Sequence, residues 1–211
     1  MRNSLTLLGL GFIIVFGGAF YAFNRSFTPA SENENSFSNS STTTMANLSL
    51  TSTDFENGGV IPTKFTCDAV SPPGGRNPQL SISGVPEGTK SLVLLMDDPD
   101  IPQVFREQRG IDSFDHWTLF NIPPLPAGET LEIAHGSTVG IVGKNGAAKN
   151  EYIGPCPPRE YEPFEHRYFF KLFALDNQLA LPEGATKKQV EEAMEGHIIA
   201  KTELVGRYKR P

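Results

Sequence analysis

Two acids and two histidines carry most of the possible chemistry in this sequence, because each stands at one end of an apolar segment. Asp98 and Asp100 follow one such segment and are separated by a single proline. His116 and His166 each precede another. Imidazole rings can donate hydrogen bonds to an anion, and carboxylates can orient those rings or bind an ammonium group. If the segments end on one side of a sheet, the sequence predicts a small binding pocket there.

Each of these residues also has a plain structural explanation. Acids in turns often only accept hydrogen bonds from nearby backbone amides, and a single histidine beside a strand is commonly a half-buried structural residue. A carboxylate with two histidines could instead ligate a divalent metal that keeps an open position. Cys156, assisted by His166, could act as a nucleophile. A metal-dependent or cysteine-dependent hydrolase therefore stays open as an alternative to a binding protein.

The elements that must position these residues are predominantly β-strands. Clusters of glycine and proline divide the chain into short pieces, and the pieces between them are apolar or aromatic. Many short strands with frequent turns predict an antiparallel sandwich or barrel. The predicted strands are Leu48–Ser52, Gln79–Ser83, Ser91–Met96, His116–Ile122, Tyr168–Leu175 and Thr202–Gly206.

One helix is predicted, over Lys187–Ile198. Thr186 and Gln189 have the spacing of a capping box, in which a threonine at the N-cap is followed three residues later by glutamine. Apolar side chains then recur every four residues from Val190 to Ile198. This pattern indicates an amphipathic helix that packs one face on the sheet.

The chain of 211 residues divides into three parts. Residues 1–23 are almost entirely apolar from Leu5 onward, long enough to cross a bilayer as a helix, and predict a transmembrane anchor or a signal segment. Residues 24–47 are rich in Ser, Thr and Asn and predict a flexible linker. Residues 48–211 then form one extracytoplasmic domain, membrane-anchored if the first segment is retained and secreted or periplasmic if it is cleaved.

Composition limits the partners and suggests one covalent link. The formal net charge is −6 and no dense basic run is present, which argues against nucleic acid as a partner. The chain has two cysteines, Cys67 and Cys156. In an exported protein such a pair suggests a disulfide bond, and two buried free thiols are the alternative.

The order and spacing of the motifs resemble the phosphatidylethanolamine-binding protein family, which includes the Raf kinase inhibitor proteins. The resemblance covers roughly Leu48 to Tyr208, and the bacterial and archaeal YbhB/YbcL-like branch is the most similar one. The motifs that carry it are DPDIP at 98–102, DHW at 115–117, GPCPP at 154–158, HRYFFKLFALD at 166–176 and GRY at 206–208.

The resemblance implies a mainly β fold of two antiparallel sheets with Greek-key connections and a C-terminal helix. It also implies a binding protein rather than an enzyme, with a pocket for a phosphate-like anion or a phospholipid headgroup and with no cofactor or metal. Relatives inhibit kinases or serine proteases, so a regulatory role such as protease inhibition is a further expectation for an exported domain. Transferred by position, the ligand-binding residues would be Asp98, Asp100, His116, Gly154, Pro155, His166 and Tyr168, with Arg167 pointing away to support its strand.

Two further expectations concern this pocket. A nearby acid favours the protonated form of an imidazole, so anion binding is expected to strengthen as pH falls. The segment 103–113 is longer than in many bacterial relatives and lies between two pocket motifs. We therefore expect this segment to shape the rim of the pocket and the size of its ligand.

Overall fold

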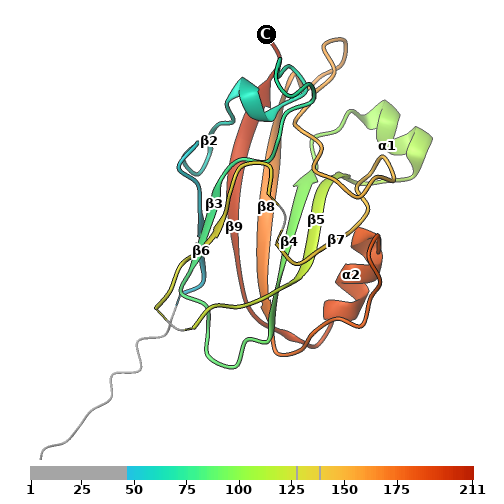
Figure 1. The fold of residues 1–211 in the computed structure, drawn as a ribbon. Helices are drawn as coiled ribbons and strands as arrows, with labels where there is room; N and C mark the ends of the chain where they lie inside the picture. Colours follow the sequence, from blue (N-terminus) through green and yellow to red (C-terminus); the bar gives the residue numbers. More distant parts are fainter. Residues whose placement is uncertain (1–46, 127, 138) are drawn as a thin grey trace, which may run out of the picture. The chain divides into compact units, whose positions relative to one another are not determined.

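A computed structural model describes residues 47–126, 128–137 and 139–211, which form a mainly β domain (Figure 1). The predicted anchor at 1–23, and the linker at 24–47 apart from its last residue, lie outside the described residues. None of the described helices has the length and apolar character needed to cross a bilayer.

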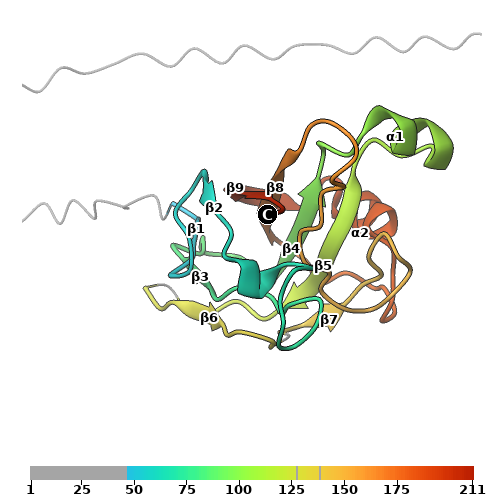
Figure 2. The same ribbon diagram turned by 90° about the horizontal axis from the view of Figure 1, so that it is seen from above.

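Two sheets form the framework of the domain. The smaller sheet has the order β1-β3-β6 and packs against one face of the larger sheet, while α2 packs against the other face (Figure 2). The larger sheet has the order β2-β9-β8-β4-β5-β7. The strands are β1 Ser49–Thr51, β2 Gly59–Val60, β3 Leu80–Ser83, β4 Ser91–Asp98, β5 Phe114–Ile122, β6 Leu131–Ile133, β7 Ile141–Val142, β8 Glu165–Leu175 and β9 Ile198–Lys209.

This architecture confirms the predicted mainly β fold of two sheets, with one departure from a purely antiparallel pairing. β2 runs parallel to β9, and Gly59 lies opposite Gly206. Backbone bonds on either side of this short strand hold it there, from the amide of Gly58 to the carbonyl of Val205 and from Ile61 to Arg207. The other paired strands are antiparallel.

β4 lies at the centre of the larger sheet and is buried along its whole length. Because side chains alternate across a strand, its residues divide between two cores. Leu92, Leu94 and Met96 pack between the sheets with Trp117 and other large side chains. Val93 and Leu95 face the second core, where Val190 and Met194 of α2 cover the sheet. The same alternation sends the two acids at the end of β4 to opposite faces.

The predicted C-terminal helix is present but shorter than expected. α2 spans Lys187–Met194, and both hydrogen bonds of the capping box between Thr186 and Gln189 are made. The prediction that the helix continues to Ile198 was wrong. Gly196 has a positive φ of 78°, which ends the helical path, and Ile198 instead begins β9 opposite Leu175.

A second helix was not predicted. α1 spans Gln103–Arg109 and connects β4 to β5, within the segment expected to shape the pocket rim. Pro102 precedes it and Gly110 ends it in the left-handed conformation, with its amide bonded to the carbonyl of Arg106. A 3-10 turn, Thr63–Phe65, is the remaining short helix of the described residues.

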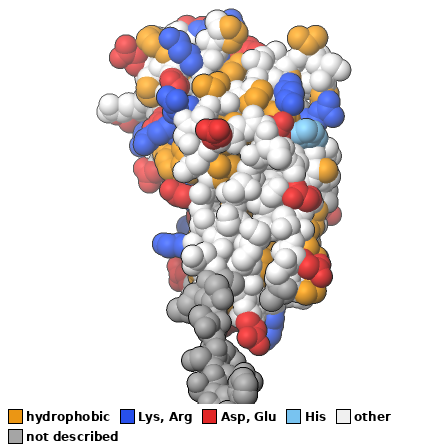
Figure 3. Space-filling view, turned by 90° about the vertical axis from the view of Figure 1, so that its left-hand side faces the viewer, with side chains coloured by type: hydrophobic (Ala, Val, Ile, Leu, Met, Phe, Trp, Pro, Cys, Tyr) orange, Lys and Arg blue, Asp and Glu red, His pale blue; other side chains and the backbone are white. Residues whose placement is uncertain are grey.

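The surface on the side of β2 carries acidic and basic side chains interspersed among polar ones (Figure 3). No large patch of a single sign appears on the described part of this face. The face therefore lacks the continuous basic track that a polyanion requires.

Candidate functional site

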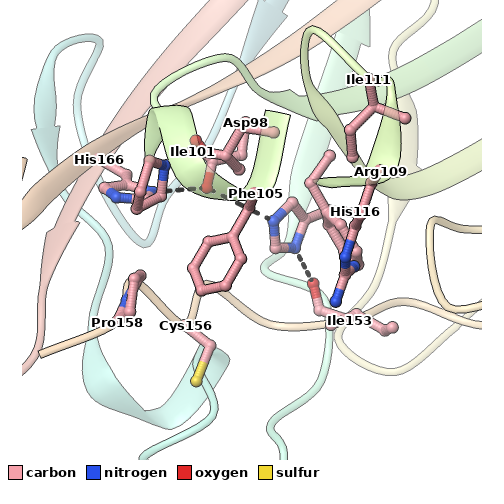
Figure 4. Close-up of a pocket in the computed structure, with 12 residues that line it drawn as sticks. Asp98, Ile101, Phe105, Arg109, Ile111, His116, Ile153, Cys156, Pro158 and His166 are labelled. Carbon is pink, nitrogen blue, oxygen red and sulfur yellow. Dashed lines mark hydrogen bonds and ion pairs between the residues drawn. The ribbon is translucent and has the colours of Figure 1, made fainter. Parts of the chain in front are cut away.

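A cavity of about 310 Å³ opens beside α1, at the end of the larger sheet (Figure 4). Asp98 is the last residue of β4, whereas His116 and His166 lie near the starts of β5 and β8. Because β4 is antiparallel to both neighbours, its end lies between their beginnings. The lining residues are Asp98, Ile101, Pro102, Phe105, Arg109, Ile111, Phe114, His116, Ile153, Cys156, Pro158 and His166.

One carboxylate oxygen of Asp98 joins the two imidazoles. Nδ1 of His166 donates a hydrogen bond to Oδ2 of Asp98 at 2.7 Å, and Nε2 of His116 lies 3.9 Å from the same oxygen. Nδ1 of His116 donates to the carbonyl of Ile153 at 2.8 Å, since a carbonyl can only accept. In Figure 4 Asp98 lies between the two rings. The free ring nitrogen of His116 is therefore the one nearest Asp98.

Asp98 is ionised although it is almost completely buried. Burial alone would raise the pKa of its carboxyl, but the imidazoles of His116 and His166 outweigh burial and hold that pKa below its usual range. We assign the larger share to His166. Its 2.7 Å contact is a hydrogen bond, whereas the 3.9 Å separation from His116 is too long for one.

A β-bulge turns His116 toward Asp98. Trp117 lies opposite Met96 on β4, and Asp115 lies opposite Asp97, so His116 has no opposite residue. The extra residue interrupts the alternation of side chains along β5. Trp117 can thus fill the core between the sheets while its neighbour His116 also faces the cavity.

Tyr168 supports the cavity from beneath instead of lining it. Its ring is fully buried and contacts the His116 ring edge-on, with centroids 5.1 Å apart. Burial, followed by the charge of Asp98, raises the pKa of Tyr168 far above its ordinary range, and the nearby Cys156 amide offsets only part of this. The phenol is therefore a neutral O–H, and this hydroxyl makes no hydrogen bond within the described residues.

The loop that contains Gly154 and Pro155 is fastened behind the cavity wall. A side chain at Gly154 would place its Cβ 2.7 Å from the carbonyl oxygen of Phe65, so only glycine allows this approach. The carbonyl of Pro155 accepts a hydrogen bond from the Cys67 amide at 3.0 Å. A disulfide bond joins Cys67 to Cys156, with 5.3 Å between their Cα atoms. Gly154 and Pro155 thus hold the loop, and Cys156 is its contribution to the cavity.

The structure places Asp100 outside this cavity, unlike the sequence-based expectation. Pro99 turns the chain, and the Asp100 carboxylate binds the Arg167 guanidinium through two contacts of 2.8 and 2.7 Å. The same carboxylate accepts the backbone amide of Arg167 at 2.9 Å. Asp100 therefore ties the turn after β4 to β8, and Arg167 lies outside the cavity with it.

Of the predicted ligand-binding residues, Asp98, His116 and His166 line the cavity, and the others support it or lie outside it. The contribution of α1, above all Phe105 and Arg109, was not predicted from the sequence. One signal points to it. Phe105 and Arg109 are spaced by four residues, which places them on one face of a helix, and Ile101 stands four residues before Phe105, just ahead of that helix.

Metal ligation at the cavity would depend on Nε2 of the two histidines. His116 and His166 each use Nδ1 in a hydrogen bond, to Ile153 and to Asp98. Within the described residues, no group of three or more His, Cys, Asp or Glu side chains is placed to hold a metal ion. Cys156 is oxidised in the disulfide, so it cannot supply a thiolate nucleophile.

Comparison with known proteins gives a consistent result. The family model described as phosphatidylethanolamine-binding protein matches residues 51–209. A UPF0098 protein of Chlamydia trachomatis is 42% identical over 164 residues, covering 77% of this chain and 99% of that protein. Another from Pyrococcus horikoshii is 41% identical over 160 residues, covering 74% of each chain.

Two solved structures are similar to this protein over nearly their whole length. A crystal structure described as a phosphatidylethanolamine-binding protein homologue, CT736 of Chlamydia trachomatis, has 40% sequence identity and a TM-score of 0.68. It covers 79% of this chain and 99% of its own. E. coli YbcL, described as a new member of the mammalian phosphatidylethanolamine-binding protein family, has 25% sequence identity and a TM-score of 0.64. The match covers 79% of this chain and 100% of YbcL.

Proposed function

The chain belongs to the phosphatidylethanolamine-binding protein family, and from this premise we propose that it is a binding protein for a phosphate-like anion or a phospholipid headgroup. One observation carries the proposal. His116 and His166 meet a single oxygen of Asp98 at a cavity, from strands that lie far apart in sequence. A purely structural sandwich has no need for this convergence.

The chemistry of the triad sets the conditions for anion binding. Asp98 is already negative, so an incoming anion is repelled unless at least one imidazole carries a proton. Nε2 of His116 and Nε2 of His166 are the nitrogens that can then donate to the anion, because Nδ1 of each ring is already in a hydrogen bond. Binding is expected to take up protons and to strengthen as pH falls.

Two observations favour binding over the hydrolase alternatives. The sulfur of Cys156 is held in the disulfide with Cys67, which contradicts a cysteine nucleophile. In the part of the chain that the structure describes, no group of three or more His, Cys, Asp or Glu side chains is placed to hold a metal ion, so a metal-dependent hydrolase has no support. No feature of the described residues favours a role as a protease inhibitor.

We also propose that residues 1–23 tether this domain to a membrane, with the domain on the extracytoplasmic side. The proposal is supported by the apolar run from Leu5 to Phe23. Deleting residues 1–47 should release a soluble, folded protein from the membrane fraction. A truncated protein that still sediments with membranes would contradict the tether.

The direct test of the cavity is a phosphate titration followed through the histidine NMR signals. The His116 and His166 resonances should shift together and saturate with one dissociation constant. His135 and His197 provide an internal control, because they lie outside the cavity and bond to Asp54 and Asp176. Equal shifts of all four signals, or none at the cavity pair, would contradict the proposal.

A further inference from the structure

Most of the cavity wall is apolar, although its base is polar. Asp98, His116, His166 and Arg109 are its charged or titratable lining residues. The remainder is dominated by large apolar side chains, which are Ile101, Phe105, Ile111, Phe114, Ile153 and Pro158. A site for an inorganic anion alone has no use for such a wall, since an ion gains nothing from apolar contact.

The α1 segment supplies apolar surface that the core does not use. α1 has no buried residue, and Phe105 is only partly covered. The Phe105 ring contacts Tyr161 edge-on, with centroids 5.5 Å apart. In Figure 4 this ring projects from α1 into view between the two imidazoles. A partly exposed aromatic ring at a cavity gains free energy when a ligand covers it.

Arg109 is the one lysine or arginine among the cavity-lining residues, and it lies in the last turn of α1. Its guanidinium makes no hydrogen bond or ion pair within the described residues, unlike two arginines nearby. Arg106 binds the carbonyls of Pro99 and Ile101, and Arg167 binds Asp100. A free guanidinium presents a planar set of donors that matches the oxygens of a phosphate or carboxylate.

The size of the cavity limits the ligand that these groups could take. A dry apolar cavity of about 150 Å³ is enough to hold benzene. The observed volume of about 310 Å³ therefore has room for an oxyanion and one ring-sized group, but not for a lipid with two acyl chains. A cationic headgroup finds only Asp98 in the lining, and that carboxylate is already bound by His166.

Resting on the proposed anion site, we propose that α1 makes this cavity selective for an oxyanion carried on a compact apolar group, such as an aromatic phosphate monoester. Arg109 binds the oxyanion from the rim and His116 from the base. Phe105 and Ile101 cover the apolar group. The preference against zwitterionic headgroups then comes from the 101–111 segment and not from the histidines.

The test compares three probes on the full chain by calorimetry, namely inorganic phosphate, phosphoethanolamine and phenyl phosphate. Phenyl phosphate should bind at least about tenfold more tightly than either of the others, since its ring becomes covered. Equal affinities would overturn the inference while leaving the anion site intact. No binding of inorganic phosphate or of either ester would instead remove the proposed function itself.

Variants on α1 identify the source of the preference. Phe105→Ala should reduce the preference for phenyl phosphate over inorganic phosphate to less than about threefold, and the ratio of the two affinities is the readout. Val104→Ala, on the same helix but outside the lining, is the matched control. An unchanged preference in Phe105→Ala would contradict the assignment, and if that variant does not fold, the wild-type ratio decides.

Arg109→Gln tests the oxyanion contact separately. It should weaken all three probes by about the same factor, near tenfold, because the anionic group is common to them. Arg76→Gln removes the same charge at a residue that does not line the cavity, and should have no such effect. A loss confined to phenyl phosphate, or no loss, would contradict the role of Arg109.

Discussion

Asp97 and Asp98 are consecutive, nearly buried acids at the end of β4, and their surroundings differ completely. Asp97 faces α2 and lies 2.7 Å from the ammonium groups of both Lys171 and Lys187. Asp98 faces the opposite side of the sheet, where its partners are two histidines and a cavity. Alternation along one strand therefore separates two ionic clusters that are adjacent in sequence.

The difference lies in the nature of the partners. Lysines stay charged at neutral pH, and although burial opposes the charge of Lys187, Asp97 outweighs burial and raises the pKa of that ammonium. The Asp97 cluster is thus permanently neutralised and fixes α2 to the sheet. The partners of Asp98 are imidazoles that line a cavity, so the Asp98 cluster can contact a ligand. The adjoining cavity, and not burial of the acid, is what distinguishes the Asp98 cluster from the Asp97 cluster.

Breaking the Asp97 cluster should produce the largest loss of stability. Asp97→Ala leaves Lys187 largely buried without its main partner and should lower the free energy of unfolding by about 3–5 kcal/mol. Urea denaturation measures this loss. Phosphate affinity of the folded variant should stay at the wild-type value, and a cost under about 1 kcal/mol would show that the cluster is not structural.

Removing the disulfide should weaken the side of the domain that holds the cavity. Cys67 and Cys156 are separated by 89 residues, and replacing both with Ser should cost roughly 2–5 kcal/mol of stability in the chain-entropy model. The wild-type protein should lose the same amount when reduced. Identical denaturation curves with and without reductant would contradict this expectation.

A substitution in the Asp98 cluster should weaken phosphate binding. His116→Ala should weaken phosphate binding by about 1.5–3 kcal/mol, the range for a hydrogen bond to a charged group. His135→Ala is the matched control, because this imidazole bonds to Asp54 away from the cavity. If calorimetry finds the same phosphate affinity in both variants, the Asp98 cluster has no role in binding the anion.

Acid should reveal the stabilisation that Asp98 provides. The pKa of this carboxyl is lowered in the folded protein, so its stabilisation is fully present above the ordinary value of 3.8 and is lost as pH falls below that value. Asp54, Asp68 and Asp100 also have lowered pKa values. The pH dependence of wild-type stability therefore cannot by itself isolate the contribution of Asp98. The stability difference between wild type and Asp98→Asn should shrink below pH 3.8, and a constant difference would contradict the argument.

Lys171→Ala should have the smallest effect. Its side chain is 37% exposed, and Asp97 keeps Lys187 as a partner after the change. We expect a loss of less than about 1 kcal/mol, typical of a solvent-accessible ion pair. A loss as large as that of Asp97→Ala would mean that the two lysines act as one unit.

The sequence predicted those features that depend on local patterns. The strands follow from apolar runs between turns, and the capping box of α2 follows from Thr186 and Gln189 alone. The helix end was mispredicted because Ile198 continues the helical spacing, whereas its pairing with Leu175 in the sheet decides its conformation. Tertiary pairing overrides local periodicity at such positions.

The site was only partly predictable for a related reason. Convergence of Asp98, His116 and His166 could be expected because three strand ends carry them. The opposite faces of Asp97 and Asp98 follow from strand alternation, but the partners that each acid meets come from the tertiary fold, and no local pattern gives those. The four-residue spacing of Phe105 and Arg109 is the one local signal for α1, and in a helix of only seven residues this signal is too short to separate a helix from a loop.

The bulge at His116 makes the cavity sensitive to the number of residues in β5 as well as to their identity. Deleting Asp115 would keep Asp98, His116 and His166, yet it would restore regular alternation opposite Met96 and Asp97. A histidine kept beside Trp117 would then face α2 and its lysines. When relatives of this chain are aligned, a one-residue gap at this point should therefore count as loss of the site, even where all of its residue types are present.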